Sequence, residues 1–536
     1  MTPKFAAIWL AAVAAGSLVA CDRSGDRPGA EAPGAERVLR RGNGGEPRTL
    51  DPALADDNHA INVLIDVYEG LTTLRPDGTP TPGVAESWRI DNNGLTYIFH
   101  LRPDARWSDG TPVLADHFVA GFRRVLAPDT TSPYAFLLDI VQNAVAVRRG
   151  ELQPSELGIR AIDSATLQID LEVPAPYFTG ILAMPIAFPQ HPRVAATSPG
   201  VSSQQEFIGN GPYLLQRWSL GERITLVRNP EFHSADSVAV ESIDYLPIVE
   251  PDTELRMYRA GELEITATVP PAAISDLTRR RPAELLITPS LALYYLAFDM
   301  SEPPFDDVAI RQALTMAIDR ETLVGLIGRG EQPAFGLVPP GVANYEASRF
   351  AWREEDRETR EQLARAAYDE AGYSRERPLQ VVLTYDTGDI HETVALAVSA
   401  MWRDALGVEV ELAKKEWLQF LADRQNRNSW QIMRFAWTGD FNDAMTFAGL
   451  FTSDSPQNLP AYRNTAYDDF LQRATGEMDA TARAALMAQA ESLLLAEYPI
   501  APLYFYVNKH LVAPNVGGFE PNVLDRHPSR YLRLSH

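Results

Sequence analysis

Aromatic residues lie beside single charged residues at several places in this sequence, and these places could bind a small charged ligand. Residues 434–442 read Arg-Phe-Ala-Trp-Thr-Gly-Asp-Phe-Asn, with one arginine and one aspartate around the aromatic side chains. Tyr294 and Tyr295 form a neighbouring pair, and Tyr134 follows a Ser-Pro step. Such sets suit a ligand that is apolar in parts and charged at its ends. A strand and loop with core aromatic residues and solvated charges would have the same composition.

The motifs of common enzyme classes are missing from the sequence. It contains no G-x-S-x-G elbow and no P-loop, and the glycines at 42–45 lack the Rossmann spacing. His391 and Glu392 begin an H-E pair, but Ala395 stands where a zinc protease has its second histidine. The nine histidines are scattered without a ligand cluster. We therefore expect no catalytic residues, no metal and no cofactor. A pair of acidic residues brought together by the fold would still permit a hydrolase.

Length and charge limit the classes of protein and partner. The chain has 536 residues, too many for one hydrophobic core, so at least two and more plausibly three lobes are expected. Its formal net charge is −23 and its pI is about 4.9, which disfavours nucleic acid as a partner. The hydrophobic content of 45% is ordinary for a globular protein and excludes a multi-span membrane protein.

The first 37 residues are typical of an exported, tethered protein. Residues 1–20 carry one charge, Lys4, followed by an apolar run that fits a secretory signal peptide. The run ends in Leu-Val-Ala before Cys21, which is the only cysteine of the chain. This resembles the bacterial lipobox, in which the cysteine is lipidated. Residues 21–37 are rich in Gly, Pro and charge and are expected to form a flexible tether. An ordinary signal peptide with an incidental cysteine is the alternative.

Helix and strand patterns alternate along the rest of the chain. Residues 96–101, 167–171 and 408–412 are strand-like, with alternating polar and apolar residues in the last two. Apolar residues recur at helical spacing in 307–327, in 389–406 with Asp389 as its expected cap, and in 479–495. The pattern predicts an α/β protein without internal repeats.

A resemblance to a known family runs along nearly the whole chain. Ordered motifs resemble those of the extracellular solute-binding proteins of the peptide-transport family (family 5): 46–52 (EPRTLDP), 68–71 (YEGL), 82–88 (PGVAESW), 107–112 (WSDGTP), 209–213 (GNGPY), 229–230 (NP) and 303–314 (PPFDDVAIRQAL). Four further motifs resemble its oligopeptide-binding branch in particular: 385–391 (YDTGDIH), 416–417 (EW), 437–442 (WTGDFN) and 502–508 (PLYFYVN).

The resemblance implies a fold and a transport function. The implied fold is the large, three-lobed form of the type II periplasmic-binding-protein architecture, with two main lobes closing on a cleft plus an extra lobe. Its lobes would be I (38–68, 191–291 and 507–536), II (69–190) and III (292–506), with chain crossings near 291 and 507. The protein would be a lipid-anchored periplasmic monomer at the inner membrane, binding oligopeptides for the permease of an ABC importer.

The resemblance also implies roles for single residues. Asp440 would pair with the peptide α-ammonium, and Tyr134 would contact the start of the peptide. Arg434 and His391 would receive the carboxylate of shorter and longer peptides, respectively. The remaining candidates, which would contact the peptide backbone or line side-chain pockets, are Tyr295, Trp417, Trp437 and Gly439. For each residue a structural role is the alternative: a solvated loop acid, a surface ion pair, a helix first-turn residue or core packing.

Two departures leave the preferred peptide length open. Asp299 stands where the family often has asparagine. Other members use a lysine for longer peptides, and the nearest cation to that position here is Arg329, which is out of register.

We expect His391, beside a ligand carboxylate, to have a raised pKa. The alternatives are a murein peptide, a dipeptide or another small solute in the same fold, and a lipid-anchored hydrolase. A protein that binds to signal rather than to feed a transporter has the same sequence features.

Overall fold

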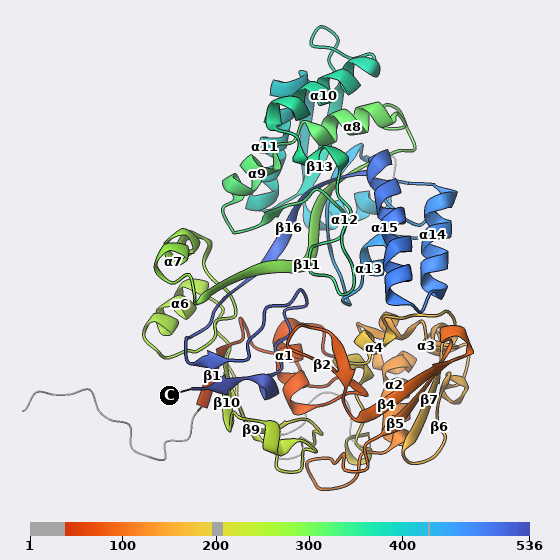
Figure 1. The fold of residues 1–536 in the computed structure, drawn as a ribbon, viewed down its shortest axis with the longest axis vertical. Helices are drawn as coiled ribbons and strands as arrows, with labels where there is room; N and C mark the ends of the chain where they lie inside the picture. Colours follow the sequence, from red (N-terminus) through yellow and green to blue (C-terminus); the bar gives the residue numbers. More distant parts are fainter. Residues whose placement is uncertain (1–37, 196–206, 427–428, 536) are drawn as a thin grey trace, which may run out of the picture. The chain divides into compact units, whose positions relative to one another are not determined.

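The computed structural model describes residues 38–195, 207–426 and 429–535, which belong to one compact unit spanning 37–536. The predicted signal peptide, the predicted lipidation site Cys21 and the predicted tether lie outside the described residues. Within these ranges, three sheets of four or more strands form the framework (Figure 1). Two-stranded sheets are formed by β2 (Thr72–Leu74) with β3 (Pro80–Pro82) and by β17 (Val516–Gly517) with β18 (Arg533–Leu534).

The first sheet joins segments that are far apart in the sequence. Its strand order is β1 (Val38–Gly42), β10 (Ser242–Leu246), β9 (Arg223–Arg228) and β8 (Tyr213–Ser219). The first pair is parallel, with Val38 opposite Ser242, and the other pairs are antiparallel. The first described strand is therefore fixed by a segment 204 positions later, so this sheet forms only after long-range closure of the chain.

The second sheet is antiparallel throughout and lies in a continuous stretch of sequence. Its order is β4 (Ala85–Asp91), β5 (Thr96–Leu101), β7 (Thr166–Asp170) and β6 (Ile159–Ala161). The predicted strand 96–101 is confirmed, and Tyr97, Phe99 and Leu101 alternate into the core. Helix α2 (Ala115–Leu126) contacts β6 and β7 and buries one apolar face that includes Phe118 and Phe122.

The third sheet is mixed and has six strands. In order they are β12 (Gln332–Pro333), β16 (Ile500–Leu511), β11 (Leu285–Phe298), β15 (Ile432–Thr438), β13 (Gln380–Asp386) and β14 (Glu409–Lys415). Strand β13 runs parallel to both β14 and β15, and its crossover to β14 is helix α11 (Asp389–Leu406). The long strands β11 and β16 run side by side in Figure 1.

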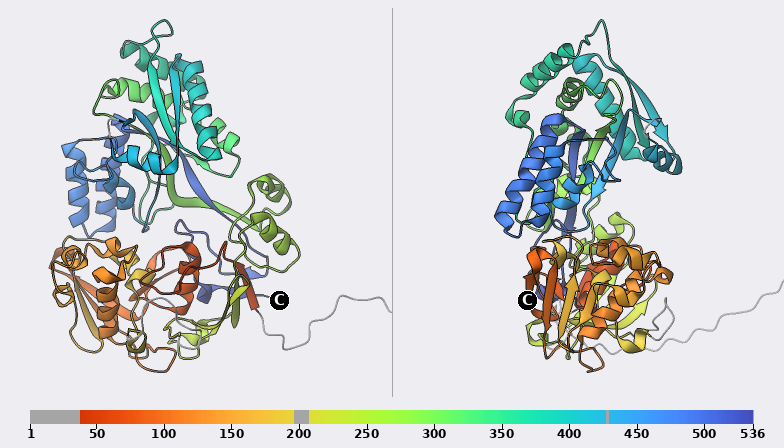
Figure 2. Two further views of the ribbon diagram at one scale, coloured as in Figure 1. Left: turned by 180° about the vertical axis from the view of Figure 1, so that it is seen from behind. Right: turned by 90° about the vertical axis from the view of Figure 1, so that its right-hand side faces the viewer.

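Helices account for much of the remaining chain. Besides α2 and α11, those of seven or more residues are α1 (Asn58–Val67), α6 (Pro251–Arg259), α7 (Ile274–Arg280), α8 (Val308–Met316), α9 (Arg320–Ile327), α10 (Arg357–Glu370), α12 (Trp417–Gln425), α14 (Thr465–Gly476) and α15 (Ala480–Glu497). The shorter ones are α3 (Ala144–Arg148), α4 (Phe178–Ile181), α5 (Pro192–Ala195) and α13 (Met445–Ala448). The antiparallel blue helices α14 and α15 pack together in both views of Figure 2. No described helix is long and apolar enough to cross a membrane.

The prediction of one continuous helix over residues 307–327 was wrong. Residues 307–327 form two helices, α8 and α9, because each has its own aspartate cap: Asp307 accepts from Ala309 N and Asp319 accepts from Thr322 N. A second correction concerns α11, which begins at Asp389 and has Gly388 as its N-cap residue. Helix α15 follows its Asp479 cap as the spacing predicts.

The hydrophobic cores separate one part of the molecule from the rest. One core takes nearly all its residues from 291–505, the segment assigned to lobe III. A second core is shared by the segments assigned to lobes I and II, and a small third core lies around α6 and α7. The expected crossings near 291 and 507 fall inside β11 and β16, and the pairing of these strands is irregular between Pro289 and Leu293.

Candidate functional site

A cavity of about 510 Å³ lies among the described residues. Its wall is formed by residues of the second sheet (β4), of the third sheet (β11, β15 and β16), of helices α1 and α15 and of the connecting loops. Its polar and aromatic lining residues include Tyr134, Tyr177, Asp440, Phe441, Asp443, Arg483, Asp525 and Arg526. This combination of a mainly apolar wall and a few charged groups is typical of a binding site for a small ligand.

Asp440 lies in this wall just after strand β15 ends. Its carboxylate has no hydrogen bond or ion pair with any residue that the structure describes, and burial raises its pKa. A half-buried carboxylate without a cation is unfavourable, because the charge has lost water without gaining a partner. The site therefore favours a ligand that brings a positive charge to Asp440.

The approach of two strands positions Asp440. Gly439 N donates a hydrogen bond of 2.7 Å to Leu291 O on β11. A Cβ atom at position 439 would lie 2.7 Å from side-chain atoms of both Leu291 and Thr446. Only glycine permits this contact, so Gly439, which also lines the cavity, supports the position of the neighbouring carboxylate.

Aromatic rings border the carboxylate. Tyr134 is half-buried, and its pKa is raised by burial and by the charge of Asp440. Tyr177 and Phe441 stack with ring centroids 4.2 Å apart and an angle of 9° between their planes. Of the predicted site residues, Tyr134, Gly439 and Asp440 line this cavity.

Arg434 and His391 meet at one carboxylate, which the sequence reasoning missed. Arg434 is buried and forms an ion pair with Asp386, the last residue of β13. His391 Nε2 lies 4.0 Å from the other oxygen of the same carboxylate. Their predicted roles toward shorter and longer peptides stay a prediction, although the two residues share one carboxylate. They converge because β13 pairs with β15, which carries Arg434, and leads into α11, which carries His391.

The protein's own groups lower the pKa of His391, and the predicted rise beside a ligand carboxylate stays a prediction. Burial lowers its pKa, the nearby Arg434 lowers it further, and Arg329 adds to the effect, although Asp386 opposes them. Its Nδ1 atom is buried without a hydrogen-bond partner among the described residues. His391 is therefore held in the neutral form when no ligand is bound, and a carboxylate from a ligand would act against that tendency.

The three remaining aromatic candidates have different environments. Tyr295 is 5% exposed, and its ring contacts Phe435. Trp437 is half-buried on β15, and its indole Nε1 has no partner within the described ranges. Trp417, at the start of α12, is 51% exposed and stacks on Phe420. None of the three lines the 510 Å³ cavity, so their contacts with a ligand stay a prediction.

Several charged residues of the cavity gave no signal in the sequence. Arg483 and Asp443 form a buried ion pair of 2.5 Å between α15 and the loop after Asp440. Arg526, which donates a 2.9 Å hydrogen bond to Asn58 Oδ1, comes from the C-terminal segment. Phe441 could have been proposed from its place beside Asp440. Tyr177, Arg483 and Arg526 stand in no recognisable motif.

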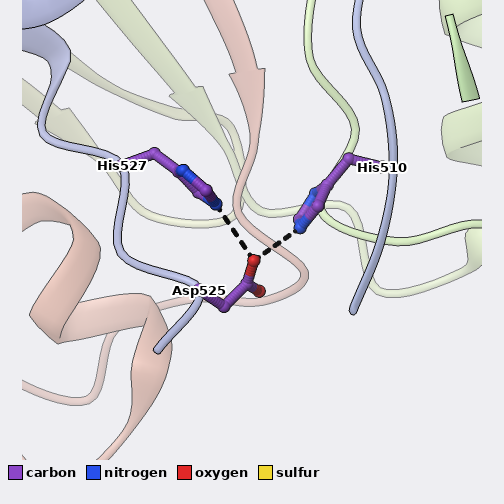
Figure 3. A group of neighbouring side chains, drawn as sticks. All are labelled: His510, Asp525 and His527. Atoms are coloured by element: carbon purple, nitrogen blue, oxygen red, sulfur yellow. Dashed lines mark hydrogen bonds and ion pairs between the residues drawn. The ribbon is translucent and has the colours of Figure 1, made fainter. Parts of the chain in front are cut away.

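The fold also assembles a cluster that the sequence analysis ruled out. His510, Asp525 and His527 each place one potential metal-ligating atom within 4.8 Å of the others (Figure 3). Asp525 Oδ1 lies 2.7 Å from His510 Nε2 and 3.1 Å from His527 Nε2. The statement that the histidines form no ligand cluster was therefore wrong, because His510 and Asp525 are 15 positions apart in the chain.

Comparison with known proteins identifies relatives over the whole length. The model for bacterial extracellular solute-binding proteins, family 5, matches residues 79–458. The chain is 36% identical to the probable deoxycholate-binding periplasmic protein YgiS of Escherichia coli K12, covering 96% of this chain and 95% of that protein. It is 35% identical to the periplasmic oligopeptide-binding protein OppA of the same organism, covering 95% and 94%.

The fold is equally close to a solved structure. The unliganded open form of the periplasmic murein tripeptide-binding protein MppA superposes with a TM-score of 0.88 at 33% identity, covering 94% of this chain and 98% of that one. The three sheets described above are thus those of the α/β type II binding-protein fold.

Proposed function

The chain belongs to the bacterial extracellular solute-binding proteins of family 5, and from this premise we propose that it captures oligopeptides and delivers them to the permease of an ABC importer. Relatives named for oligopeptides and for a murein tripeptide match it over nearly their full length, which supports a peptide ligand. The observation that carries the proposal is the unpartnered carboxylate of Asp440.

Asp440 selects for the amino end of a peptide. A peptide α-ammonium is a cation with three donor hydrogens, and it would compensate the charge that burial leaves isolated in the wall. Tyr134 and the stacked pair of Tyr177 and Phe441 supply apolar surface for the first side chain. The site would thus recognise a feature that all unblocked peptides share.

The carboxyl end has a different receptor. Arg434 is a permanent cation, but Asp386 already neutralises it, and His391 contributes charge only when protonated. We propose that these two residues together receive the peptide carboxylate. Backbone groups of an extended peptide between the two ends would provide sequence-independent hydrogen bonds.

A bile salt, the ligand in the name of one relative, fits this cavity less well. Deoxycholate has a carboxylate and no ammonium, so it would leave Asp440 without a partner. Its rigid apolar body could still use the aromatic wall. The binding experiment therefore includes deoxycholate as a competing candidate ligand.

The proposal is tested by the ligands that the protein itself selects. Native mass spectrometry of the freshly purified chain should show masses of short peptides. Isothermal titration should then give tight binding of unblocked tri- to pentapeptides, or of a murein tripeptide, and weak binding of their N-acetylated forms. Tight binding of deoxycholate with no response to any peptide would overturn the peptide assignment.

We further propose that the protein is exported and held at the inner membrane by a lipid on Cys21, followed by the tether 21–37. The lipobox-like residues before Cys21 and the periplasmic relatives support this location. In detergent phase separation the wild-type protein should enter the detergent phase and a Cys21→Ser variant the aqueous phase. Equal partitioning of both would contradict the anchor.

The remaining features of the proposal follow the family. The protein would act as a monomeric carrier rather than an enzyme, with lobes I (38–68, 191–291, 507–536), II (69–190) and III (292–506). Closure would bend β11 and β16 near residues 291 and 507, where the pairing of the strands is irregular. Small-angle scattering with and without peptide should show a smaller radius of gyration in the bound state.

A further inference from the structure

Two histidines and one aspartate form a compact cluster beside the cavity. His510 lies near the end of β16, whereas Asp525 and His527 come from the C-terminal segment (Figure 3). Both histidines are more than nine-tenths buried, and they approach the same oxygen, Oδ1 of Asp525. The ring of Phe519 stacks on His527 at a centroid distance of 3.9 Å and covers one side of the cluster.

The hydrogen bonds of His510 require a cation between its ring and Asp525. Its Nδ1 atom lies 2.7 Å from the carbonyl oxygen of Thr266, so Nδ1 must carry the hydrogen. In a neutral imidazole the Nε2 atom then presents a lone pair, yet it faces a carboxylate oxygen at 2.7 Å. Two acceptors at this distance repel unless a proton lies between them, or unless they move slightly apart so that both bind one metal ion at about 2.0–2.2 Å.

The geometry points to a metal ion: we propose that His510, Asp525 and His527 bind one divalent transition-metal ion of the zinc class. Two imidazole nitrogens and one carboxylate oxygen form the ligand set of many zinc sites that leave a further position open. The hydrogen bond from His510 Nδ1 to the Thr266 carbonyl orients its ring, as the outer shell of such sites commonly does.

The site has a route to solvent through the cavity. The Asp525 side chain is 33% exposed and lines the cavity with Arg526, while the two histidines form the closed side. An ion would therefore enter past Asp525, and its remaining coordination positions would be filled by water or by a donor atom of a ligand. The proposal does not depend on which solute the cavity carries.

Some charges around the cluster weaken metal binding, and others strengthen it. Arg41 lies close, because its Nη1 donates to His527 O at 3.0 Å, and this cation weakens metal binding. Asp525 contributes the one negative charge of the ligand set, and the chain as a whole has a formal charge of −23. The alternative is a protonated His510 that forms a simple ion pair with Asp525 without any metal.

The experiment separates a metal site from an ion pair. The untagged mature chain, stripped with chelator, is titrated with Zn²⁺ by calorimetry and with Co²⁺ by visible absorption. We expect one equivalent to bind and Co²⁺ to develop the intense d–d bands of a low-coordinate site. His510→Arg keeps a cation beside Asp525 but removes a metal ligand, and His527→Gln removes another. Each should weaken binding more than about 100-fold, beyond the effect typical of losing an outer-shell partner.

The matched control is His100→Gln, which changes an exposed histidine on β5 and should leave the affinity unchanged. Circular dichroism and melting temperature establish that each variant is folded. Absence of stoichiometric binding to the wild type would overturn the proposal, and so would equal affinity in the wild type and both cluster variants. In either case the cluster is an ion pair only. The peptide titrations are unaffected, so failure here is distinguishable from failure of the proposed transport function.

Discussion

Arg434 lies on strand β15, and Asp440 lies on the loop that follows this strand. The two charged side chains have opposite environments. Arg434 is buried in β15 and paired with Asp386, whereas Asp440 is half-buried in the cavity wall without an internal partner among the described residues. The anion thus has no partner among the described residues, whereas the cation is neutralised by the protein itself.

This difference indicates an asymmetric recognition of the two peptide ends. We expect a ligand ammonium to gain the whole interaction with Asp440, because no group in the described part of the chain competes for it. A ligand carboxylate must share Arg434 with Asp386, so its net gain is smaller. We therefore expect affinity to depend strongly on a free amino end and weakly on a free carboxyl end.

The largest effect is expected at Asp440. Asp440→Asn keeps the shape of the side chain and removes the charge, and it should weaken binding of an unblocked tripeptide by about 2–5 kcal/mol, the usual cost of removing one member of a buried charge pair. Calorimetry measures this loss. The N-acetylated tripeptide is the control, because it should bind equally poorly to both proteins. An unchanged affinity for the unblocked peptide would refute the asymmetry.

Asp386→Asn tests the role of the ion pair that neutralises Arg434. The variant leaves Arg434 buried without its anion, so the free energy of unfolding should fall by about 3–5 kcal/mol. The same change should increase the preference for a peptide acid over its amide, because the ligand carboxylate no longer competes with Asp386. Urea denaturation and paired titrations measure the two effects. A stable variant with an unchanged acid-to-amide ratio would show that the pair is independent of the ligand.

The pH dependence should come from His391. Its pKa is lowered in the free protein, so the ring is neutral near pH 7, and acidification through its pKa adds a positive charge. Affinity for a peptide acid, relative to its amide, should therefore rise as pH falls from 8 to 5. The ratio cancels the titration of Asp440, which affects both peptides alike. His391→Gln should remove the rise, and a rise that persists in this variant must originate elsewhere.

The smallest effect is expected at Trp417, which is not among the residues that line the cavity. Half of its surface is exposed, and its main ring contact is with Phe420. Trp417→Ala should cost at most about 1 kcal/mol of stability, within the scale of an aromatic pair. Its effect on peptide affinity should be smaller than that at Asp440. A loss of affinity as large as that of Asp440→Asn would instead place Trp417 in direct contact with the ligand.

Local patterns along the chain were sufficient for much of the secondary structure. The alternation in 96–101 predicted β5, and helical spacing predicted α11 and α15 to within two residues at each end. The same spacing missed the break between α8 and α9, since hydrophobic periodicity continues across it while the Asp319 cap interrupts the backbone. Because capping depends on neighbouring residues, the break before α9 could have been predicted from Asp319 in the sequence.

The site was predictable only in part. Asp440 and Gly439 were predicted from the motif at 437–442 and Tyr134 from its place after a Ser-Pro step, and all three line the cavity. The sharing of Asp386 by Arg434 and His391 was missed, because it arises from the pairing of β13 with β15, whose partners Leu383 and Ile432 are 49 positions apart. Such strand pairing leaves no trace in the spacing of a single sequence.

The sequence by itself determined the classes of partner, the α/β character and the family of this protein, because charge, periodicity and motifs are carried by neighbouring residues. Only the tertiary structure decided which charges are compensated and which are free. Asp386 joins Arg434 and His391, Asp525 joins His510 and His527, and Asp440 has no partner among the described residues. The physical reason is that the energy of a charge depends on burial and on neighbours in space, and those neighbours come from distant segments brought together by sheet closure.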